Sequence, residues 1–318
     1  MVTGMSLPLL RKFAMFDSPN ERSSHSEPTL YGGGIAVSGV TAAMFIFLSF
    51  GPFNVMPDTG SKDGLWLVIG MIVLGLISWF DDIRGVSQFF RLMVHILIVA
   101  ILLVTVFEER LVFQGWLPPW LDRICAALLW VWFINLFNFM DGIDGISGVQ
   151  TASIGIGIAF FAGTLGSESL RQDHALVLAG AAVGFLWWNW QPARVFLGDV
   201  GSVPLGFLLG WLLLNLAVNG WWLQALILPL YYLVDTTLTL LRRIYRGKKF
   251  WEAHRSHYYQ QALKKGLSHA QVSRAILIGN CLLIGLAVTS VHAPVAGIAA
   301  SAAIVFIMLL YFKHRLDD

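Results

Sequence analysis

The chain has 318 residues, of which 57% are hydrophobic and 13% are charged, and its formal net charge at pH 7 is +2. Soluble domains carry about a quarter charged residues, so the composition excludes a soluble enzyme and indicates an integral membrane protein. The two cysteines, Cys125 and Cys281, lie inside apolar runs and predict neither a disulfide framework nor a thiolate site.

Ten apolar runs approach the length of about 20 residues that a helix needs to cross a bilayer. Because backbone polar groups must be paired within each span, we predict an all-α, polytopic bundle of about ten transmembrane helices, forming one domain over residues 1–318. Arg91, His95 and Asp235 within these runs indicate helix faces turned toward a polar cavity. The runs are 32–51, 65–80, 89–107, 121–140, 147–166, 174–190, 200–219, 221–240, 274–292 and 294–312.

The positive charges set the orientation. If residues 1–31 are inside, 17 of the 21 Lys and Arg residues lie on the inner side and four on the outer side. Such a bias predicts that both chain ends are cytoplasmic. Every unusual polar cluster then falls on the cytoplasmic face.

The first cluster after the N-terminal segment is a pair of carboxylates. Asp81 and Asp82 end the second span, and Arg84 and Arg91 follow. Adjacent carboxylates repel each other unless a divalent cation or a cationic partner lies between them and a substrate. The alternative is a solvated acidic helix end that is neutralised by the local arginines.

The fourth span ends in two amides and two carboxylates at three-residue spacing. Asn135, Asn138 and Asp141 share a helical face, and Asp144 follows. Carboxylates without a compensating charge at the end of a membrane helix cost free energy. Their presence indicates a functional site with a cation or a metal-bound phosphate nearby. The alternative is an ordinary helix-ending turn.

Asp199 begins a later span within the sequence Gly-Asp-Val-Gly-Ser. Hard oxygen ligands suit Mg²⁺, and the amides at a helix N-terminus favour an anion. By itself, this pattern is also typical of a common Gly-Asp turn.

The longest polar loop, residues 241–273, contains His254, Arg255 and His257 among many basic residues. Such a loop binds anionic headgroups or, together with the acidic loops, clamps substrate phosphates. Two histidines without a cysteine or a close carboxylate favour phosphate contact over zinc. The remaining histidines have no motif around them, and we expect them to be structural or solvated: His95, His174, His269, His292 and His314.

Carboxylates for Mg²⁺ and cationic side chains for phosphates together predict phosphoryl transfer from a soluble charged donor to a membrane-held acceptor. Over residues 17–312, the motifs resemble the polyprenyl-phosphate N-acetylhexosamine-1-phosphate transferases, of the glycosyltransferase family 4 type. Within that family, Asp17 to Thr29 and Ala253 to His257 most resemble the enzymes that initiate O-antigen and related surface polysaccharides.

The resemblance implies an enzyme of the bacterial plasma membrane with a cytoplasmic active face. It implies that a UDP-N-acetylhexosamine gives its sugar-1-phosphate to undecaprenyl phosphate, yielding a lipid diphosphate sugar and UMP. Mg²⁺ is the implied cofactor, with Mn²⁺ as an alternative. The implied partners are these two substrates and membrane lipids, without nucleic acid, and a homodimer stays open.

The resemblance also assigns roles to residues. Asn138 and Asp199 match metal ligands, and Asp144 matches a uracil-side contact. Because a lipid phosphate is largely ionised near pH 7, positioning and charge neutralisation should outweigh proton removal. The implied catalytic residues are Asp81, Asp82, Asp141, Asp199, His254 and His257, and the implied substrate-binding residues are Asn135, Asn138, Asp144, Arg91 and Arg255.

Some features depart from the family. About 16 residues precede Asp17, too few to cross a bilayer, so we expect the first transmembrane helix of the family to be absent or the start to be truncated. Leu30-Tyr31 stands where relatives commonly show Pro-Arg, and the histidine loop lacks an adjacent histidine pair. The competing functions are a transporter, which predicts charges spread through the bilayer depth, and a non-catalytic subunit that handles lipid-linked sugars.

Overall fold

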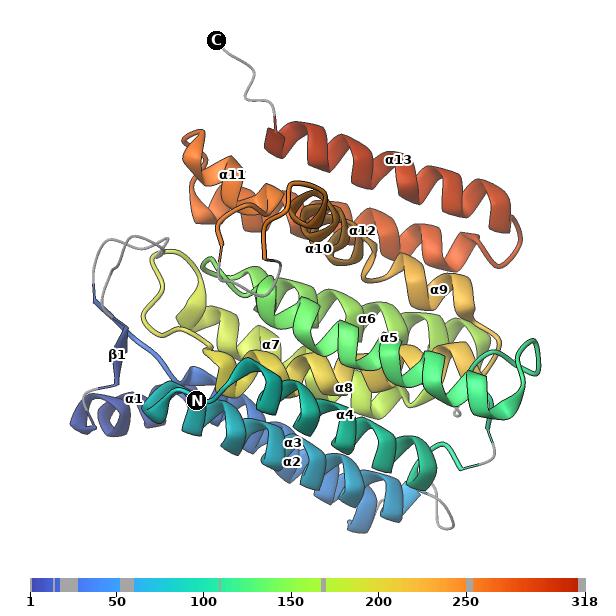
Figure 1. Cartoon of the computed structure of the whole chain (residues 1–318), viewed down its shortest axis with the longest axis horizontal. Helices are drawn as coiled ribbons and strands as arrows, with labels where there is room; N and C mark the ends of the chain where they lie inside the picture. The colour runs from blue at the N-terminus through green and yellow to red at the C-terminus, as the bar shows by residue number, and fades with distance from the viewer. Residues whose placement is uncertain are drawn as a thin grey trace.

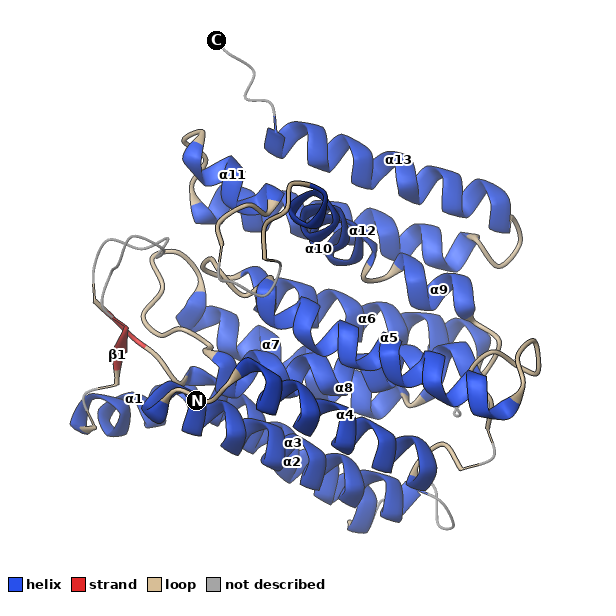
Figure 2. Ribbon diagram, in the orientation of Figure 1, coloured by secondary structure: helices blue, strands red, loops and turns tan. Residues whose placement is uncertain are grey.

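The structure is a computed structural model that describes residues 2–13, 15–17, 28–51, 60–108, 110–166, 170–249 and 254–313. Most of the segment between Asp17 and Thr29, including His25, therefore lies outside the described residues, as does His314. Figure 2 shows that the described chain is almost entirely helical.

Thirteen helices and two short strands form the described part of the chain, and the all-α expectation is confirmed. They are α1 (Val2–Lys12), β1 (Phe16–Asp17), β2 (Thr29–Leu30), α2 (Gly33–Phe50), α3 (Gly60–Arg84), α4 (Gln88–Thr105), α5 (Pro119–Phe139), α6 (Ile146–Leu165), α7 (Gln172–Asn189), α8 (Asp199–Val218), α9 (Trp222–Ile227), α10 (Leu230–Tyr245), α11 (Tyr258–Lys264), α12 (His269–Thr289) and α13 (Pro294–Lys313).

Eight of these helices are long and apolar enough to cross a membrane, namely α2, α3, α4, α5, α6, α8, α12 and α13. Another predicted run, 174–190, forms α7, which packs beside α6 and α2. The run 221–240 does not form one helix, because it divides into α9 and α10 at Leu228 and Pro229. Proline lacks the backbone N–H that would continue the helix, and it disfavours helical geometry at the preceding residue.

Helix α8 lies at the centre of the bundle. Every residue of its 18-residue apolar window is buried, and it packs against α2, α3, α5, α6 and α9. Figure 1 shows these long helices running side by side, whereas α10 is seen end-on and therefore crosses them. The central position of α8 fixes Asp199, its first residue, relative to the surrounding helices.

The N-terminal segment is attached to the loop that precedes α8. Strands β1 and β2 pair antiparallel, with Phe16 opposite Leu30, and Leu30 also forms a parallel bridge with Val195. The amides of Gly33 and Gly34 then donate to the carbonyls of Phe196 and Leu197, each at 2.9 Å. Asp17 and the start of α2 are therefore held next to the approach to Asp199.

Helix α1 is about 16 Å long at 1.5 Å per residue, which is shorter than the roughly 30 Å hydrocarbon core of a bilayer. Gly4 of α1 lies against the ring of Trp188 on α7. The helix thus packs on the outside of the bundle, in contact with α2 and α7.

Candidate active site

The motif-bearing loops meet at one end of the helical bundle. They are the α3–α4, α5–α6 and α7–α8 connections and the segment before α11, and Figure 1 shows them on its left-hand side, near β1. Helices α3 and α5 end there, and α4, α6 and α8 begin there. The alternation of helix direction therefore brings motifs that are distant in sequence into one region.

Arg91 connects two of the acidic motifs in this region. One terminal nitrogen of its guanidinium contacts Asp81 Oδ2, and the other donates to Asp199 Oδ2 at 2.8 Å. The second oxygen of Asp81 accepts the amide of Val86 at 2.7 Å. Arg91 thus joins the end of α3 to the start of α8 through a fork of two charge-assisted contacts.

Asn138 completes the cluster from the last turn of α5. Its Nδ2 donates to Asp199 Oδ1 at 2.8 Å and lies 2.9 Å from Ser202 Oγ. The amide oxygen of Asn138 is not used in these contacts. Asp81, Arg91, Asn138 and Asp199 therefore form one connected cluster, with Asp199 at its centre.

Two further acids lie within electrostatic range of Asp199. Asp82 is exposed at the surface and interacts with the charges of Asp199, Asp81 and Arg91. Burial raises the pKa of Asp141 to about 7, and the negative charge of Asp199 adds to the effect. The Asp141 carboxyl therefore holds its proton more readily than an exposed aspartate does.

Tyr31, which stands at the departure from the family pattern, also faces the acids. Burial raises the pKa of its hydroxyl, and the negative charges of Asp82 and Asp17 raise it further. The N-terminal segment thus contributes a neutral phenol next to the paired carboxylates.

Asn135 lies one turn before Asn138, away from the loops. Its Nδ2 donates to the carbonyl of Val131 at 2.7 Å and lies 3.4 Å from His95 Nδ1. His95 is 2% exposed. Asn135 and His95 therefore form a buried polar contact beneath the cluster around Asp199.

Asp144 is held by the protein on both carboxylate oxygens. Oδ1 lies 3.0 Å from His269 Nδ1, and Oδ2 accepts the amide of Ala193 at 3.0 Å. The hydroxyl of Ser273 donates to the Asp144 carbonyl at 2.8 Å. Asp144 thus ties the 141–145 turn to the α7–α8 loop and to α12, and the contact with uracil stays a prediction. His269, which we expected to be structural or solvated, therefore contacts a predicted site residue.

Residues 254–257, which we predicted to contact substrate phosphates, do not form a simple exposed loop. His257 is 2% exposed and lies 3.3 Å from the Asp235 carboxylate, whereas His254 stacks on its ring at 4.9 Å between centroids. Burial lowers the pKa of His254 to about 4, assisted by His257 and Arg243, so this imidazole is neutral near pH 7. Direct phosphate contact from His257 would require it to leave its buried position, whereas His254 is more accessible.

Tyr259 connects the histidine segment to the acidic turn. Its hydroxyl donates to the carbonyl of Phe139 at 3.2 Å and lies directly over Gly142, where a side chain would collide with it. Tyr259 is fully buried. The segment 254–259 is thereby positioned against the same α5–α6 connection that carries Asp141.

Sequence reasoning marked Asp235 only as an acid within an apolar run, and it missed Tyr259 and the pairing of His269 with Asp144. None of these residues stands in a recognisable motif, and their partners are remote in sequence. Ser202 had a local signal, because it lies in the same Gly-Asp-Val-Gly-Ser pattern as Asp199. Within the described ranges, no group of three or more His, Cys, Asp or Glu side chains is arranged to hold a metal ion.

The chain matches the family model described as glycosyl transferase family 4 over residues 65–217. It is 25% identical to a probable undecaprenyl-phosphate N-acetylglucosaminyl 1-phosphate transferase of Bacillus subtilis (strain 168), over 96% of this chain and 86% of the relative. It is 27% identical to a decaprenyl-phosphate N-acetylglucosaminephosphotransferase of Mycolicibacterium smegmatis, over 99% of this chain and 86% of the relative.

A third relative, a phospho-N-acetylmuramoyl-pentapeptide-transferase of Chlamydia pneumoniae, is 30% identical over 56% of this chain and 57% of its own length. All three relatives carry names that describe the transfer of a phosphosugar, and the two whose names include a lipid use a polyprenyl phosphate. The residues that meet around Asp199 include Asp81, Arg91 and Asn138, all within the matched region. Over residues 65–217 the chain is therefore similar to glycosyl transferase family 4, and over nearly its whole length it resembles relatives named as polyprenyl-phosphate sugar-1-phosphate transferases.

Proposed function

We propose that the protein transfers N-acetylhexosamine-1-phosphate from a UDP-sugar to undecaprenyl phosphate. An oxygen of the lipid phosphate forms a bond to the sugar-bearing phosphorus of the donor, and the bond from that phosphorus to the oxygen bridging the two phosphates breaks. The products are undecaprenyl-diphosphate-sugar and UMP, which leaves with the bridging oxygen. No net proton or electron transfer is needed when the lipid phosphate is already ionised.

One observation carries this proposal, the cluster in which Arg91 contacts Asp81 and Asp199 while Asn138 contacts Asp199. Both substrates bring phosphate charge, so a site for their reaction needs cationic groups and metal ligands within a few ångströms of one another. The cluster supplies both at one end of an apolar bundle. A transporter would place such groups along the depth of the membrane instead.

The donor sugar is the finer part of the proposal. Two relatives that align with nearly the whole chain are named for N-acetylglucosamine transfer, whereas two muramoyl-pentapeptide transferases align with 56% and 78% of it. This difference in coverage supports a UDP-N-acetylhexosamine without a peptide as the donor.

Mg²⁺ is the proposed cofactor, with Mn²⁺ as an alternative. It is most often bound through one or two carboxylates and substrate phosphates, with water completing the shell, so the absence of a dense ligand group in the described residues is compatible with it. Asp199 and the amide oxygen of Asn138 would hold it, and Ser202 orients the Asn138 amide. When bound, the ion would neutralise charge on the donor diphosphate.

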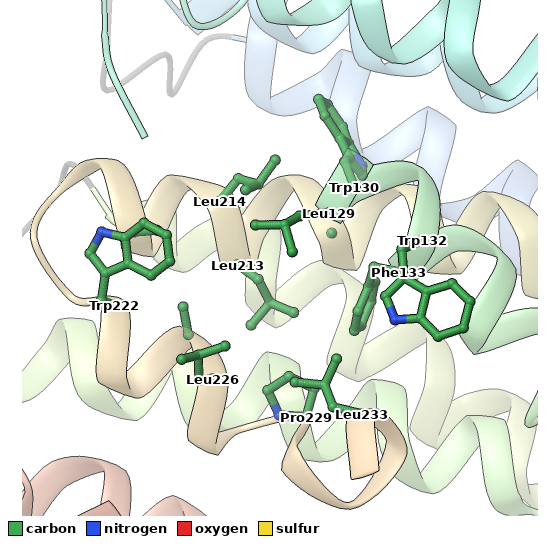
Figure 3. Close-up of a pocket in the computed structure, with 13 residues that line it drawn as sticks. Leu129, Trp130, Trp132, Phe133, Leu213, Leu214, Trp222, Leu226, Pro229 and Leu233 are labelled. Carbon is green, nitrogen blue, oxygen red and sulfur yellow. The ribbon is translucent and has the colours of Figure 1, made fainter. Parts of the chain in front are cut away.

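An apolar groove supports a polyprenyl acceptor. It has a volume of about 80 Å³ and lies between α5, α8 and the broken α9–α10 pair. In Figure 3, Trp222 lies at one end of the groove and Trp132 and Phe133 at the other. Phe133 is five residues before Asn138 on α5, so the second end is the one nearer to the cluster. We propose that a short part of the isoprenoid chain lies here, with its phosphate toward Arg91.

The protein's own residues would act mainly by positioning and charge neutralisation. Arg91 would face the lipid phosphate, Asp81 and Asp82 would lie near the reacting phosphates, and His254 and Arg255 would contact the donor diphosphate. We further propose that the site faces the cytoplasm of a bacterium, because of the distribution of Lys and Arg, and that the product starts an O-antigen or a related surface polysaccharide.

The experiment is an assay of UMP release by the purified protein with undecaprenyl phosphate, Mg²⁺ and a panel of UDP-sugars. UDP-N-acetylhexosamines should support turnover, which should be lost on removal of the metal with EDTA and restored by added Mg²⁺. Asp199→Ala should lower turnover at least about 100-fold, whereas Asp173→Ala, which removes an exposed carboxylate from the first turn of α7, should not. Equal UMP release from Asp199→Ala and wild type would refute the proposal.

A further inference from the structure

Asp235 on α10 is the most completely coordinated carboxylate among the described residues outside the Asp199 cluster. It is 0% exposed. Its Oδ1 accepts the amide of Tyr258 at 3.0 Å and the hydroxyl of Thr239 at 3.2 Å, and its Oδ2 accepts the hydroxyl of Tyr231 at 2.9 Å and the amide of Tyr259 at 3.3 Å. Four donors therefore converge on a group that can only accept.

The two amides belong to the first residues of α11, so Asp235 satisfies backbone donors that a helix N-terminus leaves without intrahelical partners. A negative charge at this end of a helix is also favoured by the helix dipole. In addition, His257 Nδ1 lies 3.3 Å from Asp235 Oδ1. One buried carboxylate on α10 thus holds the start of α11 and lies beside the imidazole that precedes it.

These contacts extend toward the candidate active site by two routes. The ring of His257 stacks on that of His254, which is more exposed than His257. Tyr259, whose amide is held by Asp235, donates its hydroxyl to the carbonyl of Phe139 at the start of the acidic turn. Asp235 itself has no solvent-accessible surface and cannot touch a substrate.

We infer that Asp235 is a positioning residue that acts through the start of α11 and the adjacent His257 to place the 254–259 segment against the donor's diphosphate. The inference rests on the proposed function, because the diphosphate is the ligand that this segment would meet. A carboxylate is required, since an asparagine would direct an N–H group at other N–H or O–H donors and leave at least one of them without an acceptor.

Asp122 provides a matched control. It is also 0% exposed, and its two oxygens accept the amides of Val112 and Phe113 at 3.0 and 2.7 Å. It lies in the first turn of α5, at the opposite end of the bundle from the acidic cluster. Asp122→Asn therefore reports what the loss of a buried backbone-capping carboxylate does to stability alone.

The kinetic test compares Asp235→Asn with Asp122→Asn in the full-length protein. Asp235→Asn should raise the KM for the UDP-sugar by about 10- to 100-fold and leave the KM for undecaprenyl phosphate within about threefold of wild type. Asp122→Asn should lower the melting temperature and leave both KM values within about threefold. A donor KM unchanged by Asp235→Asn, or changed equally by both variants, would overturn the inference.

Two further variants address coupling and folding. If Asp235 acts through His257, the double variant Asp235→Asn with His257→Ala should bind donor within about threefold of His257→Ala alone. Fully additive losses would contradict that route. Asp235→Glu retains the charge and should recover most of the donor affinity. If Asp235→Asn cannot be purified, Asp235→Glu is compared with His257→Ala instead. This comparison still decides whether the charge at position 235 sets the KM for the UDP-sugar.

Hydrogen exchange separates failure of this inference from failure of the proposed function, because it needs no substrate. The amides of Tyr258 to Ala262 should exchange at least about 10-fold faster in Asp235→Asn than in Asp122→Asn. Unchanged exchange would refute the positioning role whatever the activity. Faster exchange in a protein that releases no UMP would instead retain the positioning role and reject the transferase assignment.

Discussion

Arg91 joins the two acidic motifs because its guanidinium presents two parallel donors to two carboxylates from different helices. Asp81 lies in the last turns of α3 and Asp199 is the first residue of α8. A lysine has the same charge, but it is a compact ammonium on a flexible stem that cannot reproduce this planar fork. The geometry of the site therefore depends on the shape of the cation as well as on its charge.

Arg91→Lys should lower kcat/KM for undecaprenyl phosphate by about 10-fold or more, because only one of the two contacts can be kept at a time. Arg84→Lys is the matched control, since Arg84 is exposed in the last turn of α3, outside the contacts that join the cluster. Steady-state UMP release measures both. Equal activity of the two variants would mean that Arg91 has no role in the site.

His254 leads to a prediction about acid sensitivity. Burial beside His257 and Arg243 lowers its pKa to about 4, whereas an unfolded histidine titrates near 6.5. Since the folded-state pKa is the lower one, the neutral form stabilises the protein: the contribution is complete above about pH 6.5 and is lost as the pH falls toward 4.

The melting temperature of the wild type should therefore fall more steeply between pH 6.5 and 4.5 than that of His254→Gln, which cannot be protonated. Differential scanning measurements in detergent at several pH values give both slopes. Parallel slopes would mean that His254 titrates normally in the folded protein.

At the residue scale, the sequence predicts which motifs lie on one face, but not which atoms meet. Because successive spans end on alternate sides of the membrane, the order of the spans alone places Asp81, Asn138 and Asp199 on the same side. The capping of α11 by Asp235 and the contact of His269 with Asp144 could not be predicted, because each joins segments with no shared local pattern. The catalytic roles of the clustered residues stay predictions.

Among the elements, α2 and α8 approach unusually closely. A side chain on Gly34 would collide with the backbone of Gly201, and the amide of Gly34 also bonds to the carbonyl of Leu197 at 2.9 Å. Backbone atoms cannot rotate away as a side chain can. The glycines near residue 33 are therefore needed for helix packing that positions Asp199.

Gly34→Ala should destabilise the protein by about 1–3 kcal/mol through overpacking and should lower activity by displacing the start of α8. Gly39→Ala, on the same helix, meets no atom within 4 Å and should be neutral or slightly stabilising, because alanine favours helix more than glycine does. Thermal melts of both variants test this. Equal melting temperatures would mean that α2 and α8 can separate freely.

The α9–α10 pair shows why one predicted run does not form a single helix. Hydropathy over residues 221–240 is continuous, but Pro229 divides the run, and the second piece is an amphipathic helix that ends in Arg242 and Arg243. The proline is visible in the sequence. Its effect on direction depends on packing against α5, α12 and α13, which no local pattern reveals.

In the molecule as a whole, the apolar groove would bind the lipid chain, and the polar cluster would bind the phosphates of the proposed reaction. The groove lies among α5, α8, α9 and α10. The last turn of α5 carries Asn138, which belongs to the cluster. A lipid chain and its phosphate could therefore be bound by different parts of one helix. This arrangement depends on the break at Pro229, which itself lines the groove.

Leu129→Trp should narrow the groove and raise the KM for undecaprenyl phosphate about 10-fold, while the KM for a two-isoprene phosphate should change by less than about threefold. Leu128→Trp is the control, because Leu128 is the preceding residue on α5 and is 63% exposed, outside the groove. If both variants weaken both acceptors equally, the groove does not bind the chain.

In the proposed reaction, the sugar leaves its nucleotide together with a phosphate. Two samples of a UDP-N-acetylhexosamine, one labelled with ³²P on the sugar-bearing phosphorus and the other on the uridine-bearing phosphorus, test it directly with purified protein and undecaprenyl phosphate. The first label should move to the lipid and the second should appear in UMP. Release of both labels in UDP would show transfer of the sugar alone and would contradict the account.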